Sequence, residues 1–222
     1  VIKEQSGFFW VEVEGGQVYM CRLRGRLLEE AQSSDIAAIG DRVTITPFED
    51  NTGTIEAVAE RTSVISRAVR TEGSRGAGSA EREQVIIANA DQAIFIFAAA
   101  APAPNFGLLD RFLVMGEKSE IDQIVVVVNK IDLIEPAAAE AMFSPYVTMG
   151  YNLLFTSALM SIGTDALRAL LKDRISVFTG PSGVGKTSLL NSIQPGLGRA
   201  VKRVGSTQEG MHTTRDSELV KL

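Results

Sequence analysis

The stretch of sequence that decides the fold is Gly180-Pro181-Ser182-Gly183-Val184-Gly185-Lys186-Thr187. It fits the pattern G-x-x-x-x-G-K-[ST], and it lies between an apolar run at 175–178, typical of a buried strand, and a helix-like run at 188–193. In this context the glycines let successive backbone N–H groups curl around phosphate oxygens at the positive end of a helix. Lys186 bridges the β- and γ-phosphates, and Thr187 offers a hydroxyl to Mg²⁺. The stretch therefore predicts a nucleoside triphosphate site.

A second motif indicates which base is bound. Asn129-Lys130-Ile131-Asp132 directly follows an apolar run at 124–128, which places it at the C-terminal end of a predicted strand, where open α/β sheets bind ligands. An ionised Asp132 accepts hydrogen bonds from N1–H and the 2-amino group of guanine, whereas adenine offers neither donor. Because hydrogen bonds to a charged group are worth about 1.5–3 kcal/mol each, we predict a guanine preference of about a hundredfold or more. Thr156-Ser157-Ala158 follows the next predicted strand, and its small side chains let backbone N–H groups approach a base carbonyl.

The chain divides into two parts with different patterns. Residues 1–67 contain short β-type runs at 8–13, 17–23, 41–45 and 53–58, the first two joined by Gly15-Gly16, and they predict a small all-β barrel of the OB-fold type. Residues 68–84, which are rich in Gly and Ser in the middle and have no apolar residue larger than alanine from 70 onward, predict a flexible linker. Residues 85–222 predict an α/β domain with a mostly parallel sheet, with strands at 93–98, 124–128, 153–155 and 175–178 and helices at 108–118 and 164–172. Thr164 is the expected N-cap of the second helix.

A third motif, Gly210-Met211-His212-Thr213-Thr214, lies in a segment without clear periodicity. Its paired threonines can supply a hydroxyl or a carbonyl to the γ-phosphate and Mg²⁺, so that the segment orders only when a triphosphate is bound. The histidine has no visible partner in the sequence, and an exposed loop histidine without a function is the alternative interpretation.

Composition excludes several classes of protein. Of the 222 residues, 45% are hydrophobic and 22% charged, which is typical of a globular protein and not of a disordered or fibrous chain. The longest apolar run, 93–101, is too short to span a membrane. One cysteine, Cys21, and one histidine leave too few ligands for a zinc site. Because a single cysteine cannot form an internal disulfide, we expect a reducing compartment. The chain starts at Val1 without an apolar leader and without an initiator Met, so we expect missing N-terminal residues.

The order of the motifs is unusual, because the base-reading motif at 129 precedes the phosphate loop at 180, whereas most GTPases have the reverse order. With this order, the sequence resembles the ribosome-small-subunit-dependent GTPase A family, circularly permuted GTPases with an N-terminal OB-fold. The resemblance spans nearly the whole chain and is strongest after residue 85. It is carried by Ala90-Asp91-Gln92, Pro104-Asn105-Phe106, Leu109-Asp110-Arg111-Phe112-Leu113, Asn129 to Leu133, Phe155 to Ala158, Gly180 to Asn191, and Gly210 to Thr214.

The resemblance implies hydrolysis of GTP to GDP, stimulated by the small (30S) ribosomal subunit during its late maturation. It implies that the phosphates are held by Gly180, Pro181, Ser182, Gly183, Val184, Gly185, Lys186, Thr187 and Ser188, and that guanine is read by Asn129, Lys130, Asp132, Ser157 and Ala158. It also implies that Thr187 binds Mg²⁺ together with Thr213 or Thr214. Lys186 and His212 are the implied catalytic residues, and His212 positions the water. Implied partners are the small subunit and 16S rRNA, with a monomeric protein in the cytoplasm or, alternatively, in an organelle.

The sequence departs from the family pattern in two places. The third threonine expected after Thr214 is Arg215, which leaves the Mg²⁺ ligand open between Thr213 and Thr214. Family members continue into a D-x-P-G loop and a zinc domain rich in Cys and His, and the sequence ends at Leu222 before either. We therefore expect either a truncated protein or a remainder that this sequence does not represent, and a fragment that binds nucleotide and hydrolyses it poorly.

Two surfaces are candidates for RNA contact despite the net charge of −5. Basic residues cluster at Arg22, Arg24 and Arg26, and again at Arg199, Lys202, Arg203 and Arg215. Phe8, Phe9 and Trp10 can stack on bases, although packing in the core is their commoner use. Besides a GTPase, the sequence allows an OB-fold RNA-binding module with a weakly hydrolysing nucleotide domain, or an ATP-dependent P-loop kinase.

Overall fold

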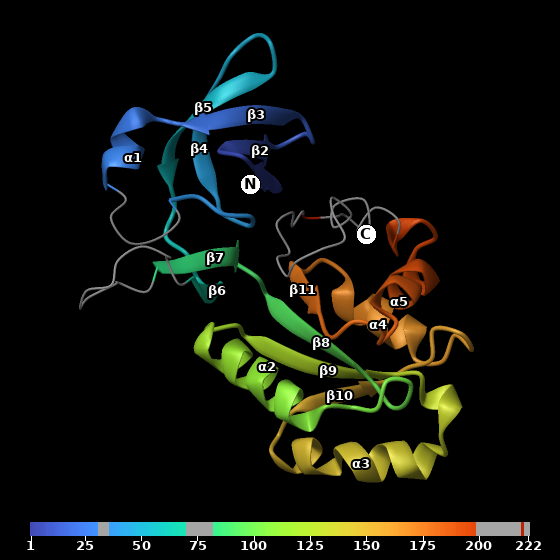
Figure 1. Cartoon of the computed structure of the whole chain (residues 1–222). Coiled ribbons are helices and arrows are strands. Elements are labelled where there is room, and N and C mark those ends of the chain that lie inside the picture. Colours follow the sequence, from blue (N-terminus) through green and yellow to red (C-terminus); the bar gives the residue numbers. More distant parts are fainter. Residues whose placement is uncertain (31–35, 70–81, 199–218, 220–222) are drawn as a thin grey trace, which may run out of the picture. The chain divides into compact units, whose positions relative to one another are not determined.

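The computed structural model describes residues 1–30, 36–69, 82–198 and 219, which form two compact units (Figure 1). The first unit runs from Val1 to Asn89, and the second begins at Ala90. Most of the predicted linker, 70–81, lies outside the described residues. Strand β7 (Arg82–Ala88), which follows it, pairs with β6 (Val64–Val69) in an antiparallel hairpin of the first unit. The division between the two compact units therefore falls after this hairpin.

The first unit contains a five-stranded mixed sheet with the order β1-β2-β3-β5-β4. The strands are β1 (Lys3–Gln5), β2 (Phe8–Glu12), β3 (Val18–Leu23), β4 (Val43–Pro47) and β5 (Thr52–Val58), and the short helix α1 (Gly25–Glu30) follows β3. The predicted hairpin is β2–β3, in which Gly15 and Gly16 adopt positive φ angles. Alternate residues such as Phe9, Val11 and Cys21 form the core. This strand-rich unit fits the OB-fold that the sequence predicts.

The second unit is built on a four-stranded parallel sheet with the order β10-β9-β8-β11. Its strands are β8 (Gln92–Ala98), β9 (Gln123–Asn129), β10 (Asn152–Phe155) and β11 (Ser176–Thr179). The connections carry α2 (Phe106–Lys118), the short 3₁₀ helix η1 (Ile131–Leu133), α3 (Pro136–Thr148) and α4 (Thr164–Leu171), and α5 (Lys186–Ile193) follows β11. Every residue of β8 is buried, as expected for a strand covered on both faces. The predicted parallel sheet is confirmed.

Two local features differ from the sequence predictions. Helix α3 was not predicted from the sequence, because Pro145 is unfavourable inside a helix and the apolar residues do not form one narrow stripe. Pro136, in contrast, suits the first helical position. The N-cap of α4 is Gly163, not Thr164. Gly163 has a φ of +69°, and a Cβ there would lie 2.3 Å from the carbonyl oxygen of Phe155, so close packing against β10 selects glycine at the cap. None of the described helices has the length and apolar character needed to cross a membrane.

Candidate functional site

The three predicted strand-end motifs lie at one edge of the parallel sheet. Strand β9 ends at Asn129, β10 at Phe155 and β11 at Thr179, and the motifs follow directly. Because all four strands are parallel, their carboxyl ends point the same way. The structure therefore brings together the phosphate loop, the Asn129–Asp132 motif and the Thr156–Ala158 motif. Residues 212–214, from the remaining predicted motif of the site, lie outside the described residues.

The glycines of the phosphate loop have separate structural tasks. A Cβ on Gly180 would lie 2.1 Å from the carbonyl oxygen of Ile96, so this glycine lets the loop leave β11 against the neighbouring strand β8. Gly183 and Gly185 have φ angles of +81° and +94°, which turn the loop back on itself. Gly185 is the N-cap of α5, so the turn ends at a helix N-terminus, where free backbone N–H groups attract anions.

Lys186 is held in place by the loop that it follows. Its Nζ donates hydrogen bonds to the carbonyl oxygens of Gly180 (2.7 Å) and Pro181 (2.6 Å). Burial lowers the pKa of this ammonium group, because desolvation disfavours the charged form. The two carbonyl dipoles offset the desolvation cost of the ammonium group less than an anion would. The arrangement thus places a partly buried cation at the loop, where phosphate charge would stabilise it.

Asn129 links all three motifs through its side-chain amide. Its Nδ2 donates to the carbonyl oxygen of Val184 in the phosphate loop, at 2.8 Å. Its Oδ1 accepts from the hydroxyl of Thr156 and from the backbone N–H of Ala158, both at 3.2 Å. The residue is 1% exposed. The base-reading role of Asn129 stays a prediction, and in the structure its amide group fixes the relative positions of the loops.

The carboxylate of Asp132 is oriented by the neighbouring loop. The hydroxyl of Ser157, which is fully buried, donates a short hydrogen bond to Asp132 Oδ1. The backbone N–H of Ile131 donates to the carbonyl oxygen of Thr156, 3.2 Å away. Ser157 uses only one acceptor site of the carboxylate, so its two oxygens can still accept hydrogen bonds from another pair of donors.

Lys130 links the base-reading motif to the loop after β8. It has a left-handed backbone, with φ of 62°, and its Nζ donates a short hydrogen bond to the carbonyl oxygen of Ala101. Its Cε lies 3.8 Å from where a Cβ on Gly185 would be. The aliphatic stem of Lys130 therefore runs alongside the phosphate loop, as a wall for a ligand that spans the two motifs.

Thr187 is the described candidate for binding Mg²⁺. It lies at the second residue of α5, it is half-buried, and within the described ranges no hydrogen bond forms to its hydroxyl. A hydroxyl is a hard oxygen ligand, which suits this cation. Sequence reasoning missed its neighbour Gly198: a Cβ there would lie 2.5 Å from the carbonyl oxygen of Thr187 and 2.7 Å from its Cγ2. The N–H of Gly198 also donates to Asn191 Oδ1, at 2.9 Å, which holds this contact in place.

A separate polar cavity of about 500 Å³ lies at the opposite edge of the sheet, where the strands begin. It is lined by Asp91, Asp122, Gln123, Asn152, Asp173 and Arg174. Three carboxylates face one guanidinium there, so its charge does not suit a triphosphate. The chemistry of the carboxyl edge, with Lys186 and the helix N-terminus, does suit one.

Comparison with known proteins agrees with this geometry. A family model described as RsgA GTPase matches residues 58–222, and one described as RsgA N-terminal domain matches residues 1–55. The small ribosomal subunit biogenesis GTPase RsgA of Moorella thermoacetica is 39% identical, over 100% of this chain and 69% of that protein. The relative of the same name from Gemmatimonas aurantiaca is 37% identical, over 96% of this chain and 68% of that protein.

Two solved structures share the fold. YjeQ from Thermotoga maritima has a TM-score of 0.68 at 33% identity, over 89% of this chain and 64% of that one. YloQ, described as a circularly permuted GTPase, has a TM-score of 0.61 at 32% identity, over 86% of this chain and 62% of that one. The chain thus spans less than two thirds of the length of these solved relatives. Both family models together cover nearly all of its residues, and on these grounds the chain belongs to the RsgA GTPase family.

Proposed function

We propose that this protein binds GTP at the carboxyl edge of the parallel sheet, hydrolyses it to GDP and phosphate, and acts in the assembly of the small ribosomal subunit. The observation that carries the proposal is the hydrogen-bonded link through Asn129. This one side chain joins the loop that holds Lys186 to the loop that holds Asp132, so a cation for phosphate and an acid for guanine belong to one site. The part of the proposal that concerns the small ribosomal subunit is supported by the names of the relatives.

The residues of the site divide the work as follows. Asp132 accepts from the two guanine donors, with Ser157 keeping its carboxylate oriented, and the stem of Lys130 lies beside the ring. The N–H groups of the phosphate loop and Lys186 hold the phosphates, and neutralise the charge that develops on them during hydrolysis. Thr187, with Thr213 or Thr214, would hold Mg²⁺, which would stabilise negative charge on the phosphates. His212 positions the attacking water.

The partner is the small subunit through its 16S rRNA, and the protein acts as a monomer in the cytoplasm. Arg22 and Arg24 are exposed on the first unit, where they can reach RNA phosphates. Of the second predicted basic cluster, Arg199, Lys202, Arg203 and Arg215 all lie outside the described residues.

Steady-state hydrolysis measured with and without 30S subunits tests the proposal. We expect GTP turnover that rises when subunits are added, and little turnover of ATP. GTP binding without stimulated turnover would instead support an RNA-binding module with a regulatory nucleotide domain. Equal competition by ATP would support a kinase-like activity.

The base assignment has its own test in Asp132→Asn. The new amide donates to the C2 carbonyl of xanthine, so we expect GTP affinity to fall by about a hundredfold and xanthosine triphosphate to bind instead. Asp165→Asn is the matched control, since its side chain is 95% exposed on α4 and the change should leave base preference unaltered. Unchanged preference in Asp132→Asn would remove this carboxylate from the base site.

A further inference from the structure

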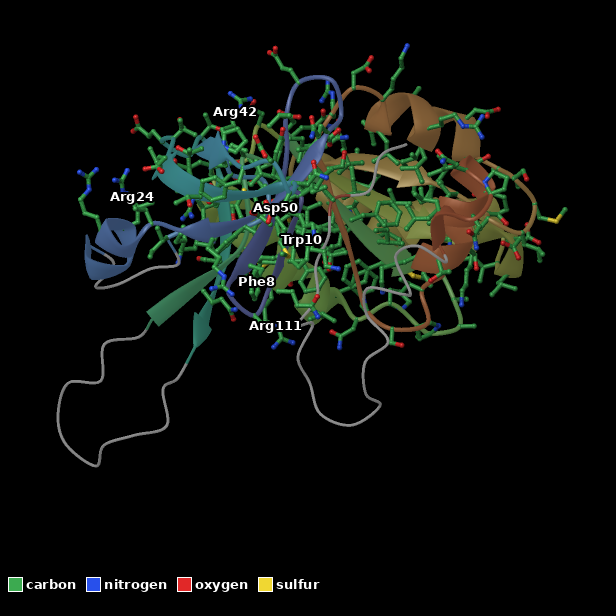
Figure 2. The ribbon with its side chains drawn as sticks, turned by 90° about the horizontal axis from the view of Figure 1, so that it is seen from above. Phe8, Trp10, Arg24, Arg42, Asp50 and Arg111 are labelled. Carbon is green, nitrogen blue, oxygen red and sulfur yellow. The ribbon has the colours of Figure 1, made fainter. Side chains whose placement is uncertain are left out.

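The sheet of the first unit has one face in the core and one face in solvent. Along β2 the burial alternates, so that Phe9 and Val11 are buried while Phe8, Trp10 and Glu12 are partly exposed. The register places Trp10 between Lys3 on β1 and Met20 on β3. Phe8 pairs with Gln5 on β1, and the side chain of Arg22 from β3 lies over its ring. The sequence grouped three consecutive aromatic residues, and the structure separates the core ring of Phe9 from the partly exposed rings of Phe8 and Trp10. Figure 2 labels these two outer residues of β2.

A basic side chain lies over each of these two outer rings. The Lys3 Nζ is 5.0 Å from the centroid of the Trp10 ring, and the guanidinium carbon of Arg22 is 4.5 Å from that of Phe8. We call these four residues, Lys3, Trp10, Phe8 and Arg22, the two-ring platform. Core packing does not account for it, because the rings occupy the face opposite the core and Arg22 is exposed.

The energies of the competing contacts favour a nucleic-acid ligand on the rings. A cation–π contact at an exposed site is worth about 0.5–1 kcal/mol. Stacking of a nucleobase on an aromatic ring is worth about 1–3 kcal/mol. A base can therefore displace the cation from the ring, and the released cation remains next to the phosphate of the same nucleotide. Each ring and its cation together form a subsite for one nucleotide.

The spacing of the rings selects unpaired bases. Phe8 and Trp10 are two residues apart on one strand, so their attachment points are about 6.7 Å apart. Successive bases in one strand of a duplex are stacked in direct contact, about 3.4 Å apart along the axis in B-DNA. Two neighbouring bases that stack on both rings must therefore be separated from each other, which a duplex does not allow.

We propose that the two-ring platform binds two neighbouring unpaired nucleotides of RNA, with their bases on Phe8 and Trp10 and their phosphates near Lys3 and Arg22. This rests on the proposed function in one respect, namely that the partner is a ribosomal subunit. It adds which surface makes the contact and that the RNA there is single-stranded. An OB-fold offers its β2–β3 face to oligonucleotides in general, and the platform occupies this face.

The protein itself provides the probe, because Trp10 is its single tryptophan. Titration of the full chain with an unstructured oligouridylate of about ten nucleotides should quench Trp10 fluorescence to saturation. An RNA duplex of matched length should bind more weakly and quench little. Tighter binding of the duplex, or binding of the oligouridylate without quenching, would overturn the proposal.

Variants then separate stacking from charge. Phe8→Leu keeps apolar volume and removes the ring, so affinity for the oligouridylate should fall by about 5- to 150-fold. Arg22→Gln should reduce the slope of log affinity against log salt by about 0.7, the value for one phosphate contact on a single strand. Phe48→Leu and Arg42→Gln change an exposed aromatic and an exposed cation outside the platform, and should leave affinity unchanged. Equal losses in these controls, or none in Phe8→Leu, would contradict the platform.

The outcome is independent of the GTPase proposal. Each variant is checked for a melting temperature close to that of the wild type and for unchanged GTP affinity, so that loss of folding is distinguished from loss of RNA binding. If GTP turnover is stimulated by 30S subunits but the oligouridylate does not quench Trp10, the platform fails alone. If quenching is seen without GTP turnover, the GTPase proposal fails alone.

Discussion

The two sheets of this protein place their functional residues differently. In the second unit, β8 is buried along its whole length, and candidate site residues lie beyond the strand ends. In the first unit, burial alternates along β2, and the candidate RNA-binding residues lie on the strand itself. The difference follows from what covers each sheet. A parallel sheet needs crossover connections that bury both its faces, whereas a small barrel keeps one face in water.

The largest contrast between the sheets should appear in stability. Ile94→Ala removes a fully buried side chain from β8, and the resulting cavity should lower the free energy of unfolding by about 2–5 kcal/mol. Met20→Thr changes a 38% exposed residue on the outer face of β3 and should stay within about 0.5 kcal/mol. Urea denaturation measures both. Similar losses would show that the outer face of the first sheet is also covered, which would remove the basis of the comparison.

A smaller effect should come from the strand end itself. Gly180→Ala places a methyl group against the Ile96 carbonyl, which belongs to a central strand and cannot move aside. We expect a loss of about 1–3 kcal/mol in unfolding free energy, with GTP affinity reduced by more than about tenfold. Gly150→Asn is the control outside the phosphate loop: asparagine tolerates its positive φ of 96°, and no atom lies within 4 Å of a new Cβ. Isothermal titration with GTP gives the affinities, and equal affinity in both variants would contradict the assigned packing role.

The contact of Gly198 with Thr187 should matter for Mg²⁺. The backbone of Gly198 is not left-handed, so Gly198→Ala is opposed only by the contacts with Thr187 and Asn191. We expect Mg²⁺ to strengthen GTP binding about tenfold less in this variant, with binding in EDTA unchanged. Gly196→Asn is the control in the same turn, because its positive φ suits asparagine and no atom lies within 4 Å of a new Cβ. A loss that persists in EDTA would show a general distortion of α5 instead.

The smallest effect concerns the proton on Lys186. Burial lowers the pKa of this group in the free protein, and bound phosphate should raise it again. The charged form is therefore fully present below the lowered pKa and is lost as the pH rises through it. GTP affinity should fall by about threefold over the pH unit centred on that pKa, with protons taken up on binding. Titrations in buffers of different ionisation enthalpy measure this uptake, and Lys186→Arg should abolish it.

Sequence patterns predicted the second unit more completely than the first. Long apolar runs located all four strands of the parallel sheet, because strands that are buried on both faces need apolar residues at every position. Helix α3 had no comparable signal, since Pro145 is unfavourable in a helix interior. The helix buries Phe143 and Tyr146, whose rings are in contact. In the first unit, nothing in the run Phe8-Phe9-Trp10 showed which ring faces the core.

The candidate site shows the same division. Motif spacing placed Lys186, Asp132 and Ser157 in one site, because each motif follows a strand. The roles of Asn129 and Gly198 were not visible in the sequence, since their contacts are with residues that are distant along the chain or packed across a turn. Local secondary-structure propensities contain no information about such contacts.

By itself, the sequence determined the chemistry: a loop of glycines with a lysine, an acid suited to guanine, and the order of the motifs along the chain. Only the tertiary structure decided which residues hold these chemical groups in position, which glycines are required by close packing, and which aromatic rings face solvent. The physical reason is that composition and spacing are local properties of the chain, whereas burial, hydrogen-bond partners and close approach depend on segments that folding brings together.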